Sequence, residues 1–364
     1  MSMYKEASNA EINAVMERSL NAFQQYRNIS SDDKAVFLET IATEIEALGD
    51  ALIEQASAET NLPTARLLGE RGRTTYQLRM YAAMLREGSW VEASIDTAIP
   101  DKTPPKPDIR KQLIALGPVV VFGASNFPFA YSTAGGDTAS ALAAGCSVVV
   151  KAHPAHASTS QMVCEAIQAA ITKTNMPKDI FQHVHGTSFG IGEALVKHDT
   201  TAAVGFTGSF LGGKALYDHA AARKNPIPVF SEMGSINPVL LLPDSLNINA
   251  ASLAKQLAAS ITLGMGQFCT NPGLMIAVES ESLHSFIGSL STEMEKVIPA
   301  NMLHKGIQGA YYNRVHDVLA QKGVTLVQQS SAAVKNMEAL PTIATVSSKI
   351  FLANPLLHEE VFGP

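Results

Sequence analysis

Cys269 is the cysteine whose surroundings suggest chemistry, because it lies in the glycine-rich segment GMGQFCTNPG. Gly264 and Gly266 allow backbone angles that other residues rarely adopt, and they let the chain approach a ligand closely. Cys146 lies in an apolar run and Cys164 in an amphipathic helical pattern, so we interpret both as small buried hydrophobic side chains. A thiol becomes reactive beside a base or in a positive field, so on local context Cys269 is compatible with either role.

Two polar side chains could assist a nucleophilic thiol. Asn126 follows the apolar run VVVFGA, in GASNFPF, and its amide could donate to an oxyanion, or it could simply form a turn before Pro128. Glu232 follows a short β-rich run, in FSEMGSINP, and could act as a general base or be a solvated loop charge. Taken alone, each of these two residues is compatible with the structural role as well as with the chemical one.

The signals for a nucleotide are indirect, because the sequence contains no G-x-G-x-x-G motif. Instead, GFTGSFLGG places Gly208 and Ser209 at a strand-to-helix turn, with Gly213 five residues beyond Gly208. Backbone N–H groups at the start of that helix could bind a phosphate. Lys151 ends the run SVVVK and could hold a ribose hydroxyl or a phosphate, or could be a solvated strand end.

Four histidines occur as two close pairs: His153, His156, His183 and His185. No carboxylate or cysteine shares their spacing in a zinc-like pattern, so we predict no metal site. We expect these histidines to lie in loops at strand ends.

The elements that would position these residues begin with helices. Helical patterns cover residues 9–27, a stretch from Ser30 or Ser31 to about Gly49, and a stretch from Pro63 toward Gly88. Asp32 and Asp33 belong to the first turn of the second pattern.

A proline-rich segment at about residues 91–107 follows, and it predicts either a linker or an arm of edge strands. From Lys111 onward, short β-rich runs alternate with helical patterns, which indicates βαβ units and a parallel sheet covered on both faces. In such sheets, ligands bind at the carboxyl ends of the strands. After about Ser235 a second strand–helix series begins, which predicts a second α/β domain.

Composition sets the class of protein. The chain is 46% hydrophobic and 16% charged, which is typical of a globular protein rather than a disordered one. Its net charge of -6 disfavours nucleic acid as a partner, and no apolar stretch is long enough to span a bilayer. The N-terminus has no apolar signal core and the cysteines are few, so we expect a cytoplasmic protein without disulfides.

The order of the motifs is more specific than any one of them. SNFPF, a strand ending in Lys151, GFTGS, EMGSINP, GQFCTNPG and EEVFGP follow one another in a series that resembles the aldehyde dehydrogenase superfamily, from about residue 10 to the last residue. The segments GASNFPFAYSTAGGDTASALAAGC and MGSINPV are most similar to the α-ketoglutaric semialdehyde and NADP-dependent fatty aldehyde dehydrogenases.

The resemblance implies a Rossmann-like NAD(P)-binding domain at residues 1–90 and 112–234, an oligomerisation arm at 91–111 and a catalytic domain at 235–364. The chain ends inside EEVFGP, where family members continue, so we expect the catalytic domain to be incomplete at its C-terminus. The full-length protein is expected to be a homodimer or homotetramer.

The resemblance also implies a role for each matching residue. Cys269 would attack a small-molecule aldehyde, Asn126 and the Cys269 N–H would hold the oxyanion, and Glu232 would activate water. The product would be a carboxylic acid, formed through a thiohemiacetal and a thioester with NADP or NAD as the oxidant. The residues expected to bind the coenzyme are Lys151, Phe206, Gly208, Ser209, Gly213, Glu360 and Phe362.

Some positions depart from the family's pattern. Ser125 replaces a common tryptophan, and Ser235 replaces the second glycine of the base motif. Pro154 stands three residues after Lys151, where NAD-preferring relatives carry a glutamate that would repel a 2'-phosphate. We therefore expect NADP to be used at least as well as NAD, with His153 or the pair Ser158 and Thr159 as additional donors.

Three other functions are compatible with parts of the pattern. A cysteine-dependent acyl hydrolase would pair Cys269 with a histidine and bind no dinucleotide, and an inactive fragment would bind coenzyme without oxidising aldehydes. A CoA-acylating relative usually lacks the base, so Glu232 argues against it. The substrate stays open: an α-keto semialdehyde requires an arginine near the tunnel mouth, and a fatty aldehyde requires an apolar tunnel.

Overall fold

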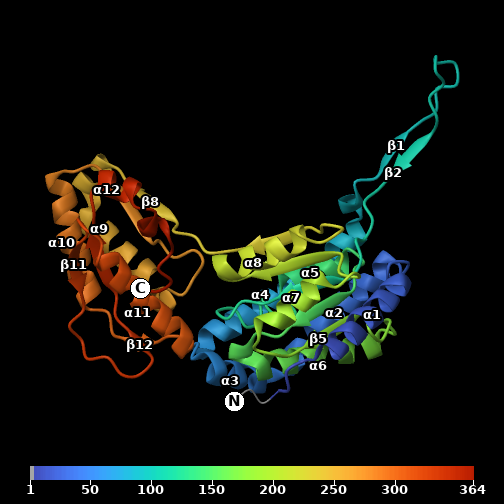
Figure 1. The fold of residues 1–364 in the computed structure, drawn as a ribbon, viewed down its shortest axis with the longest axis horizontal. Coiled ribbons are helices and arrows are strands. Elements are labelled where there is room, and N and C mark those ends of the chain that lie inside the picture. The colour runs from blue at the N-terminus through green and yellow to red at the C-terminus, as the bar shows by residue number, and fades with distance from the viewer. Residues whose placement is uncertain (1–3) are drawn as a thin grey trace. The chain divides into compact units, whose positions relative to one another are not determined.

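The structure, a computed structural model, describes residues 4–364, and within them the chain forms two compact units. Of the described residues, unit 1 comprises 4–59 and 63–233, and unit 2 comprises 60–62 and 234–364. Each unit contains both helices and strands (Figure 1). The predicted α/β class is confirmed.

Unit 1 is built on a five-stranded sheet with the order β5-β4-β3-β6-β7, in which every neighbouring pair is parallel. Val120 lies at the centre, in register with Val149 on one side and Val204 on the other. The valine-rich runs form strands here because both faces of a parallel sheet are covered. The strands are β3 (Val119–Phe122), β4 (Val148–Lys151), β5 (Phe181–Val184), β6 (Ala203–Thr207) and β7 (Val229–Glu232).

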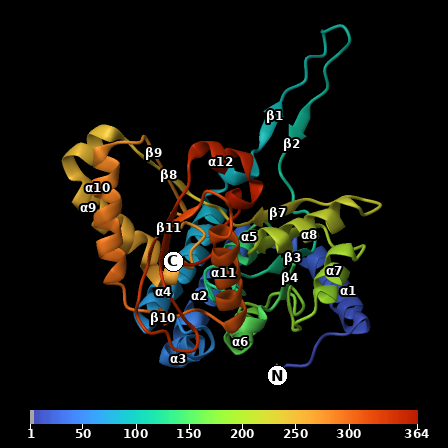
Figure 2. The same cartoon turned by 60° about the vertical axis from the view of Figure 1, so that its left-hand side comes forward.

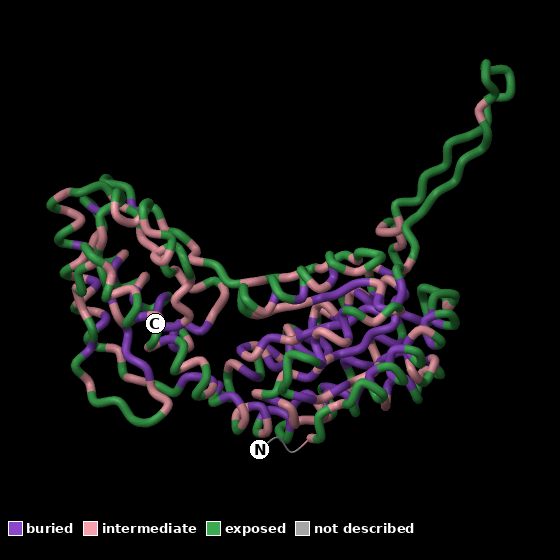
Figure 3. The backbone as a smooth tube through the Cα atoms, viewed as in Figure 1, coloured by how far each residue is buried: buried purple, intermediate pink, exposed green. Residues whose placement is uncertain are grey.

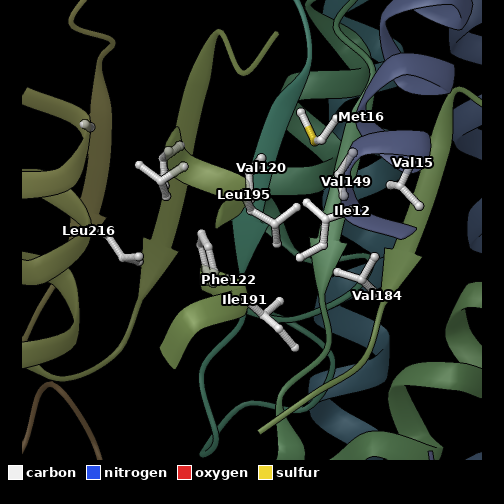
Figure 4. Packing of buried hydrophobic residues seen from close by; sticks show 13 residues of the cluster. Ile12, Val15, Met16, Val120, Phe122, Val149, Val184, Ile191, Leu195 and Leu216 are labelled. Carbon is white, nitrogen blue, oxygen red and sulfur yellow. The ribbon is translucent and has the colours of Figure 1, made fainter. Parts of the chain in front are cut away.

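Helices cover this sheet on both faces, as the alternation predicted. One face packs against α1, α7 and α8 in a core that includes Ile12, Val120, Leu195 and Leu216 (Figure 4). Because side chains alternate along a strand, Val121 and Val150 point to the opposite face, where α5 and α6 contact the strands. The helices of this unit are α1 (Asn9–Tyr26), α2 (Ser31–Ala47), α3 (Gly49–Thr60), α4 (Thr64–Glu87), α5 (Gly136–Ala143), α6 (Ala157–Lys173), α7 (Phe189–Lys197) and α8 (Phe210–Ala221), with short 3-10 turns at Ser89–Val91 and Pro154–His156.

The predicted helix starts agree with the structure to within one residue, and one helix was missed. The Ser30 hydroxyl caps α2 by accepting a hydrogen bond from the Asp33 N–H at 3.1 Å. Gly49 was expected to end this helix region, but with φ +58 it links α2 to a further helix, α3. Leu52 and Ile53 of α3 are buried, so tertiary packing stabilises a helix that the glycine signal had hidden. Pro63 caps α4 rather than starting it.

The proline-rich segment forms a hairpin of edge strands rather than an irregular linker. β1 (Ser94–Asp96) pairs antiparallel with β2 (Ile109–Lys111), and both strands are exposed throughout. The hairpin extends away from the rest of unit 1 (Figure 2) and is solvent-exposed along most of its length (Figure 3). Ile95 is 67% exposed, so the arm carries apolar surface that its own unit does not cover.

Unit 2 contains the second strand–helix series expected after Ser235. β8 (Pro238–Leu241) runs parallel to β9 (Leu274–Ala277), and α9 (Pro243–Thr262) and α10 (Glu281–Glu295) pack on one another around Phe286. A smaller core surrounds Met265, Met302 and Tyr311. The remaining elements are β10 (Ala300–Asn301) paired with β12 (Glu338–Ala339), β11 (Thr325–Gln329) paired with β13 (Thr342–Thr345), α11 (Lys305–Leu319), α12 (Ser348–Ala353), and 3-10 turns at Leu263–Gly266 and Pro355–His358.

Within residues 4–364, no helix is both long enough and apolar enough to cross a membrane.

Candidate active and coenzyme sites

The carboxyl edge of the unit 1 sheet carries most of the residues predicted for that unit. Lys151 is the last residue of β4, Glu232 is the last residue of β7, and Phe206 lies near the end of β6. Phe122 at the end of β3 is in register with both Lys151 and Phe206. The parallel register therefore brings these side chains to one edge of the sheet, where ligands of such folds bind. Asn126 follows β3 at the same edge.

Two glycines at the turn between β6 and the first part of α8 have no room for a side chain. A Cβ added to Gly208 would lie 2.7 Å from Phe206 Cζ, and one added to Gly213 would lie 2.7 Å from Met233 Sδ. Because these positions must be glycine or shift their neighbours, the backbone of the turn stays bare and open to close approach. This geometry suits a pyrophosphate.

Ser209 shapes the same turn by capping α8. Its Oγ accepts a hydrogen bond from the Gly212 N–H at 3.3 Å, and the neighbouring Gly208 N–H donates to the Glu232 carbonyl at 3.0 Å. The first N–H groups of a helix have no partner within the helix, and their dipoles favour an anion. Phe210 and Leu211, which start α8, are exposed, so a phosphate can reach this helix end.

Lys151 has the electrostatic environment of a binding residue. Partial burial lowers the pKa of its ammonium group to about 8, and the Glu6 carboxylate opposes this shift. Burial is the main cause that lowers the pKa of His185 and of His156, and the positive charge of Lys151 lowers both further. A half-desolvated ammonium at a strand end gains more from a bound hydroxyl or phosphate than a fully hydrated one.

The start of α6, where additional donors to the coenzyme were expected, is bound by a carboxylate. The Glu59 carboxylate accepts hydrogen bonds from the Ser158 N–H (2.9 Å), the Thr159 N–H (2.8 Å) and the Thr159 hydroxyl (2.7 Å). Thr159 is fully buried. Both N–H groups and the Thr159 hydroxyl are therefore bound to a carboxylate in this structure, and the role of Ser158 and Thr159 as donors to a 2'-phosphate stays a prediction. Sequence reasoning missed Glu59 because it lies about a hundred positions away, on α3.

Asn126 is held in a closed loop after β3. The Ala124 N–H donates to the Tyr131 carbonyl at 2.8 Å, which closes the loop, and Asn126 is only 8% exposed. Arg66 of α4 donates from Nη2 to the Asn126 carbonyl at 2.6 Å and lies over the Phe127 ring at 5.0 Å. These contacts fix the backbone of the residue expected to stabilise an oxyanion, as preorganisation requires.

Glu232 combines a fixed backbone with an exposed side chain. Its carbonyl accepts the Gly208 N–H, while its carboxylate is solvent-exposed at the end of β7. A base that activates water needs such access.

In unit 2, Cys269 follows a strained turn. Gly264, Met265 and Gly266 have φ values of +55, +55 and +65. A left-handed Met costs about 1–2 kcal/mol, and the burial of Met265 in the smaller core of unit 2 offsets this strain. Gln267 anchors the turn, because its Oε1 accepts the Leu303 N–H at 2.9 Å and its Nε2 donates to the Gly264 carbonyl at 3.0 Å.

Asn237 holds the backbone around Cys269, and the sequence analysis had not identified it. Its Nδ2 donates to the Cys269 carbonyl at 2.6 Å and to the Asn271 carbonyl at 2.9 Å. Asn237 has φ +40, a conformation that asparagine tolerates better than most residues. Cys269 itself is half-buried, whereas Cys146 and Cys164 are buried, as predicted for them.

The EEVFGP segment packs on the Cys269 segment within unit 2. Asn271 Nδ2 donates to the Gly363 carbonyl at 3.0 Å, and a Cβ on Gly266 would collide with that carbonyl. Glu360 lies against Gly234, whose Cβ would collide with its carboxylate, and burial raises the pKa of Glu360. Phe362 is half-buried beside it in the chain. Within unit 2, the last residues of the chain thus pack against the segment that carries Cys269.

His153 and His185 lie in loops just after β4 and β5, as expected, whereas His156 belongs to the 3-10 turn Pro154–His156. His183 lies inside β5, contrary to the expectation of a loop, and burial lowers its pKa to about 3. Its Nε2 is 2.8 Å from the Ser160 Oγ, and His156 Nε2 is 3.0 Å from the Ala124 carbonyl. Among the described residues, no group of three or more His, Cys, Asp or Glu side chains is arranged so that it could hold a metal ion.

Comparison with known proteins gives the family. A sequence model of the aldehyde dehydrogenase family matches residues 1–364. Alpha-ketoglutaric semialdehyde dehydrogenase 2 of Azospirillum brasilense is 50% identical to this chain, and the match covers 98% of the chain and 68% of that protein. Alpha-ketoglutaric semialdehyde dehydrogenase of Acinetobacter baylyi is 42% identical, and the match covers 100% of the chain and 69% of that protein.

Solved structures show the same fold at low sequence identity. Betaine aldehyde dehydrogenase of Staphylococcus aureus aligns with a TM-score of 0.84 at 19% identity, over 99% of this chain and 71% of that one. Proline utilization A of Bdellovibrio bacteriovorus aligns with a TM-score of 0.82 at 21% identity, over 99% of this chain but only 37% of that one. The resemblance read from the motif series, and the enzyme class that it implied, NAD(P)-dependent aldehyde dehydrogenase, are confirmed at the level of the family. The chain belongs to the aldehyde dehydrogenase family.

Proposed function

We propose that this chain oxidises a carboxylate-bearing aldehyde, with α-ketoglutaric semialdehyde as the first candidate, to the corresponding acid with NAD or NADP. Family membership and the names of the two curated relatives support the reaction and the substrate class. The observation that carries the mechanism is the setting of Cys269. A half-buried thiol follows a left-handed turn and lies on a backbone that Asn237 holds.

In the proposed reaction, the Cys269 thiolate adds to the aldehyde carbon and forms a thiohemiacetal. The Asn126 amide and the Cys269 N–H donate to the oxyanion that develops on the former carbonyl oxygen. When bound, the nicotinamide would supply the hydride acceptor. The former aldehyde carbon would lose its hydride as the oxyanion reforms a carbonyl, which leaves a thioester on Cys269. Glu232 then takes a proton from a water molecule that attacks the Cys269 thioester, which releases the acid and restores the thiol.

The coenzyme residues fit a dinucleotide. The bare turn of Gly208 and Gly213 and the exposed start of α8 suit the pyrophosphate, and the desolvated Lys151 suits the adenosine ribose. Phe206 and Ser209 complete the turn. We further propose that Glu360 and Phe362 hold the nicotinamide ribose and ring.

The domain roles follow from these assignments. Residues 1–90 and 112–234 would bind NAD(P), residues 235–364 would carry the nucleophile, and the hairpin at 91–111 would join subunits of a homodimer or homotetramer. The exposed Ile95, Ile99 and Ile109 support an interface on the hairpin, because apolar surface of this kind is costly in water.

Activity assays on cysteine variants test the proposal. The chain is incubated with α-ketoglutaric semialdehyde and NADP or NAD, and the reduced coenzyme is followed by its ultraviolet absorbance. Cys269→Ala should abolish turnover yet leave coenzyme binding intact, as measured by calorimetry. Cys146→Ala and Cys164→Ala are matched controls and should retain turnover. Substantial oxidation by the Cys269 variant would overturn the mechanism, and binding without oxidation by the unaltered chain would indicate an inactive coenzyme-binding fragment.

A further inference from the structure

One face of α4 carries polar side chains that contact the Asn126 loop. Arg66, Glu70 and Arg73 are spaced i, i+4, i+7, so they share one side of the helix. Gln77 follows Arg73 by four residues and extends the same stripe. Its side chain lies against Gly136, since a Cβ there would lie 3.1 Å from the Gln77 Nε2. The helix therefore presents two cations and one carboxylate to the segment that holds the proposed oxyanion donor.

Two members of the stripe fasten the loop. Arg66 donates to the Asn126 carbonyl at 2.6 Å. Glu70 is 6% exposed, and its Oε1 accepts hydrogen bonds from the Phe129 N–H (2.8 Å) and the Ala130 N–H (3.0 Å). Arg66 and Glu70 thus hold the loop through its backbone carbonyl and N–H groups, and we assign both as positioning residues.

Arg73 differs from these two because it is exposed. Its guanidinium carbon lies 5.0 Å from the Tyr131 ring centroid, and its Nη2 donates to the Tyr131 hydroxyl at 2.6 Å. A guanidinium has five N–H groups, so one bond to a phenol leaves donors for a two-point interaction with a carboxylate. The stacking on Tyr131 fixes the plane of the fork, which reduces the entropy lost when a ligand binds.

We propose that Arg73 binds the carboxylate of the aldehyde substrate, and so selects semialdehydes of dicarboxylic acids over neutral aldehydes. The proposal rests on the proposed function, because it names the residue that recognises the far end of the same substrate. Tyr131 acts as the positioning residue that orients Arg73.

The same loop connects the two proposed contacts. Arg66 donates to the backbone carbonyl of Asn126, whose side-chain amide would hold the aldehyde oxygen, and Arg73 donates to the hydroxyl of Tyr131, five residues further along the chain. The loop that carries the proposed oxyanion donor therefore also orients the guanidinium of Arg73.

The alternative is that Arg73, like Arg66, only fastens the loop through Tyr131. In that case its removal would disturb Asn126 and slow the oxidation of every aldehyde alike. A carboxylate ligand, in contrast, makes the loss specific to charged substrates. The comparison of charged and neutral aldehydes separates the two roles.

The experiment measures kcat and KM of the chain with α-ketoglutaric semialdehyde and with pentanal, a neutral aldehyde of equal carbon number. For Arg73→Gln, kcat/KM for the semialdehyde should fall about 10- to 100-fold, mainly through KM, because a charge-assisted interaction is lost. Pentanal kinetics should be unchanged. Arg73→Lys should retain part of the preference, and Tyr131→Phe should raise KM for the semialdehyde alone. Arg79→Gln is the matched control, because Arg79 lies on the same helix but pairs with Glu46 at 2.6 Å.

Binding of the dicarboxylate product α-ketoglutarate provides a readout without turnover. Calorimetry should show at least tenfold weaker binding to Arg73→Gln than to the unaltered chain or to Arg79→Gln, again as expected for loss of a charge-assisted pair. Equal losses for both aldehydes, or undiminished α-ketoglutarate binding, would overturn the role of Arg73 and leave the proposed function standing. If the unaltered chain oxidises neither aldehyde, the proposed function itself fails.

Discussion

Asn237→Ala is the perturbation that most directly tests how the Cys269 segment is held. The variant loses hydrogen bonds from Nδ2 to the Cys269 carbonyl at 2.6 Å and to the Asn271 carbonyl at 2.9 Å. Each bond contributes about 0.5–1.5 kcal/mol net. Alanine is also less tolerant than asparagine of φ +40, which adds to the cost. We therefore expect the free energy of unfolding of unit 2 to fall by about 2–3 kcal/mol.

The assay combines urea unfolding with thiol reactivity. The single tryptophan, Trp90, belongs to unit 1, so its fluorescence follows unit 1, whereas far-ultraviolet circular dichroism follows the helices of both units. A change in the dichroism transition without a change in the fluorescence transition therefore reports unit 2. Iodoacetamide modification of Cys269 in the native protein, located by peptide mass, reports the order of the segment. The variant should unfold at lower urea with an unchanged slope and should show an altered Cys269 modification rate. Unchanged stability together with an unchanged rate would refute the role of Asn237.

Three further predictions concern the coenzyme. NADP affinity should weaken as pH rises through about 8, because Lys151, whose pKa burial lowers to about 8, is charged below that pH and neutral above it; Lys151→Arg should flatten this profile, and an unchanged slope in that variant would exclude Lys151 as the titrating group. Glu59→Gln should raise the ratio of NADP to NAD efficiency several-fold by removing a negative charge at the start of α6, while a weaker α6 cap lowers stability by about 1 kcal/mol; a constant ratio would show that Glu59 only caps the helix. Gly208→Ala should weaken coenzyme binding because its Cβ would lie 2.7 Å from Phe206 Cζ; calorimetry measures the effect, and an unchanged Kd would contradict the assignment of the turn.

The strand ends at the site could be predicted from the sequence because their signals are local. A valine-rich run that stops at Lys151 and a run that stops before the glycine of EMGS both mark the end of a strand. Ser209 has the position of a helix cap and serves as one. Hydrophobic periodicity, secondary-structure propensity and turn-forming residues predict such features to within a few positions.

The contacts that hold the site could not be predicted in this way. Glu59 meets the start of α6, Arg66 meets the Asn126 carbonyl, and each pair is 60 or more positions apart in the chain. Their partners are main-chain groups, whose location depends on how whole elements pack. At Gly49 the local signal was correct but incomplete. The glycine marks the end of α2, as predicted, but α3 begins at the same glycine because its side chains are buried in the core.

The most direct test of the central claim is to trap the acyl group on Cys269. Glu232→Gln should complete one hydride transfer, seen as a burst of reduced coenzyme, and then stall because the thioester is not hydrolysed. After the burst, mass spectrometry of the peptide that contains Cys269 should show the added acyl group, and the Cys269→Ala/Glu232→Gln double variant should show neither burst nor adduct. A full burst with unmodified Cys269, or an adduct on Cys146 or Cys164 instead, would contradict the account.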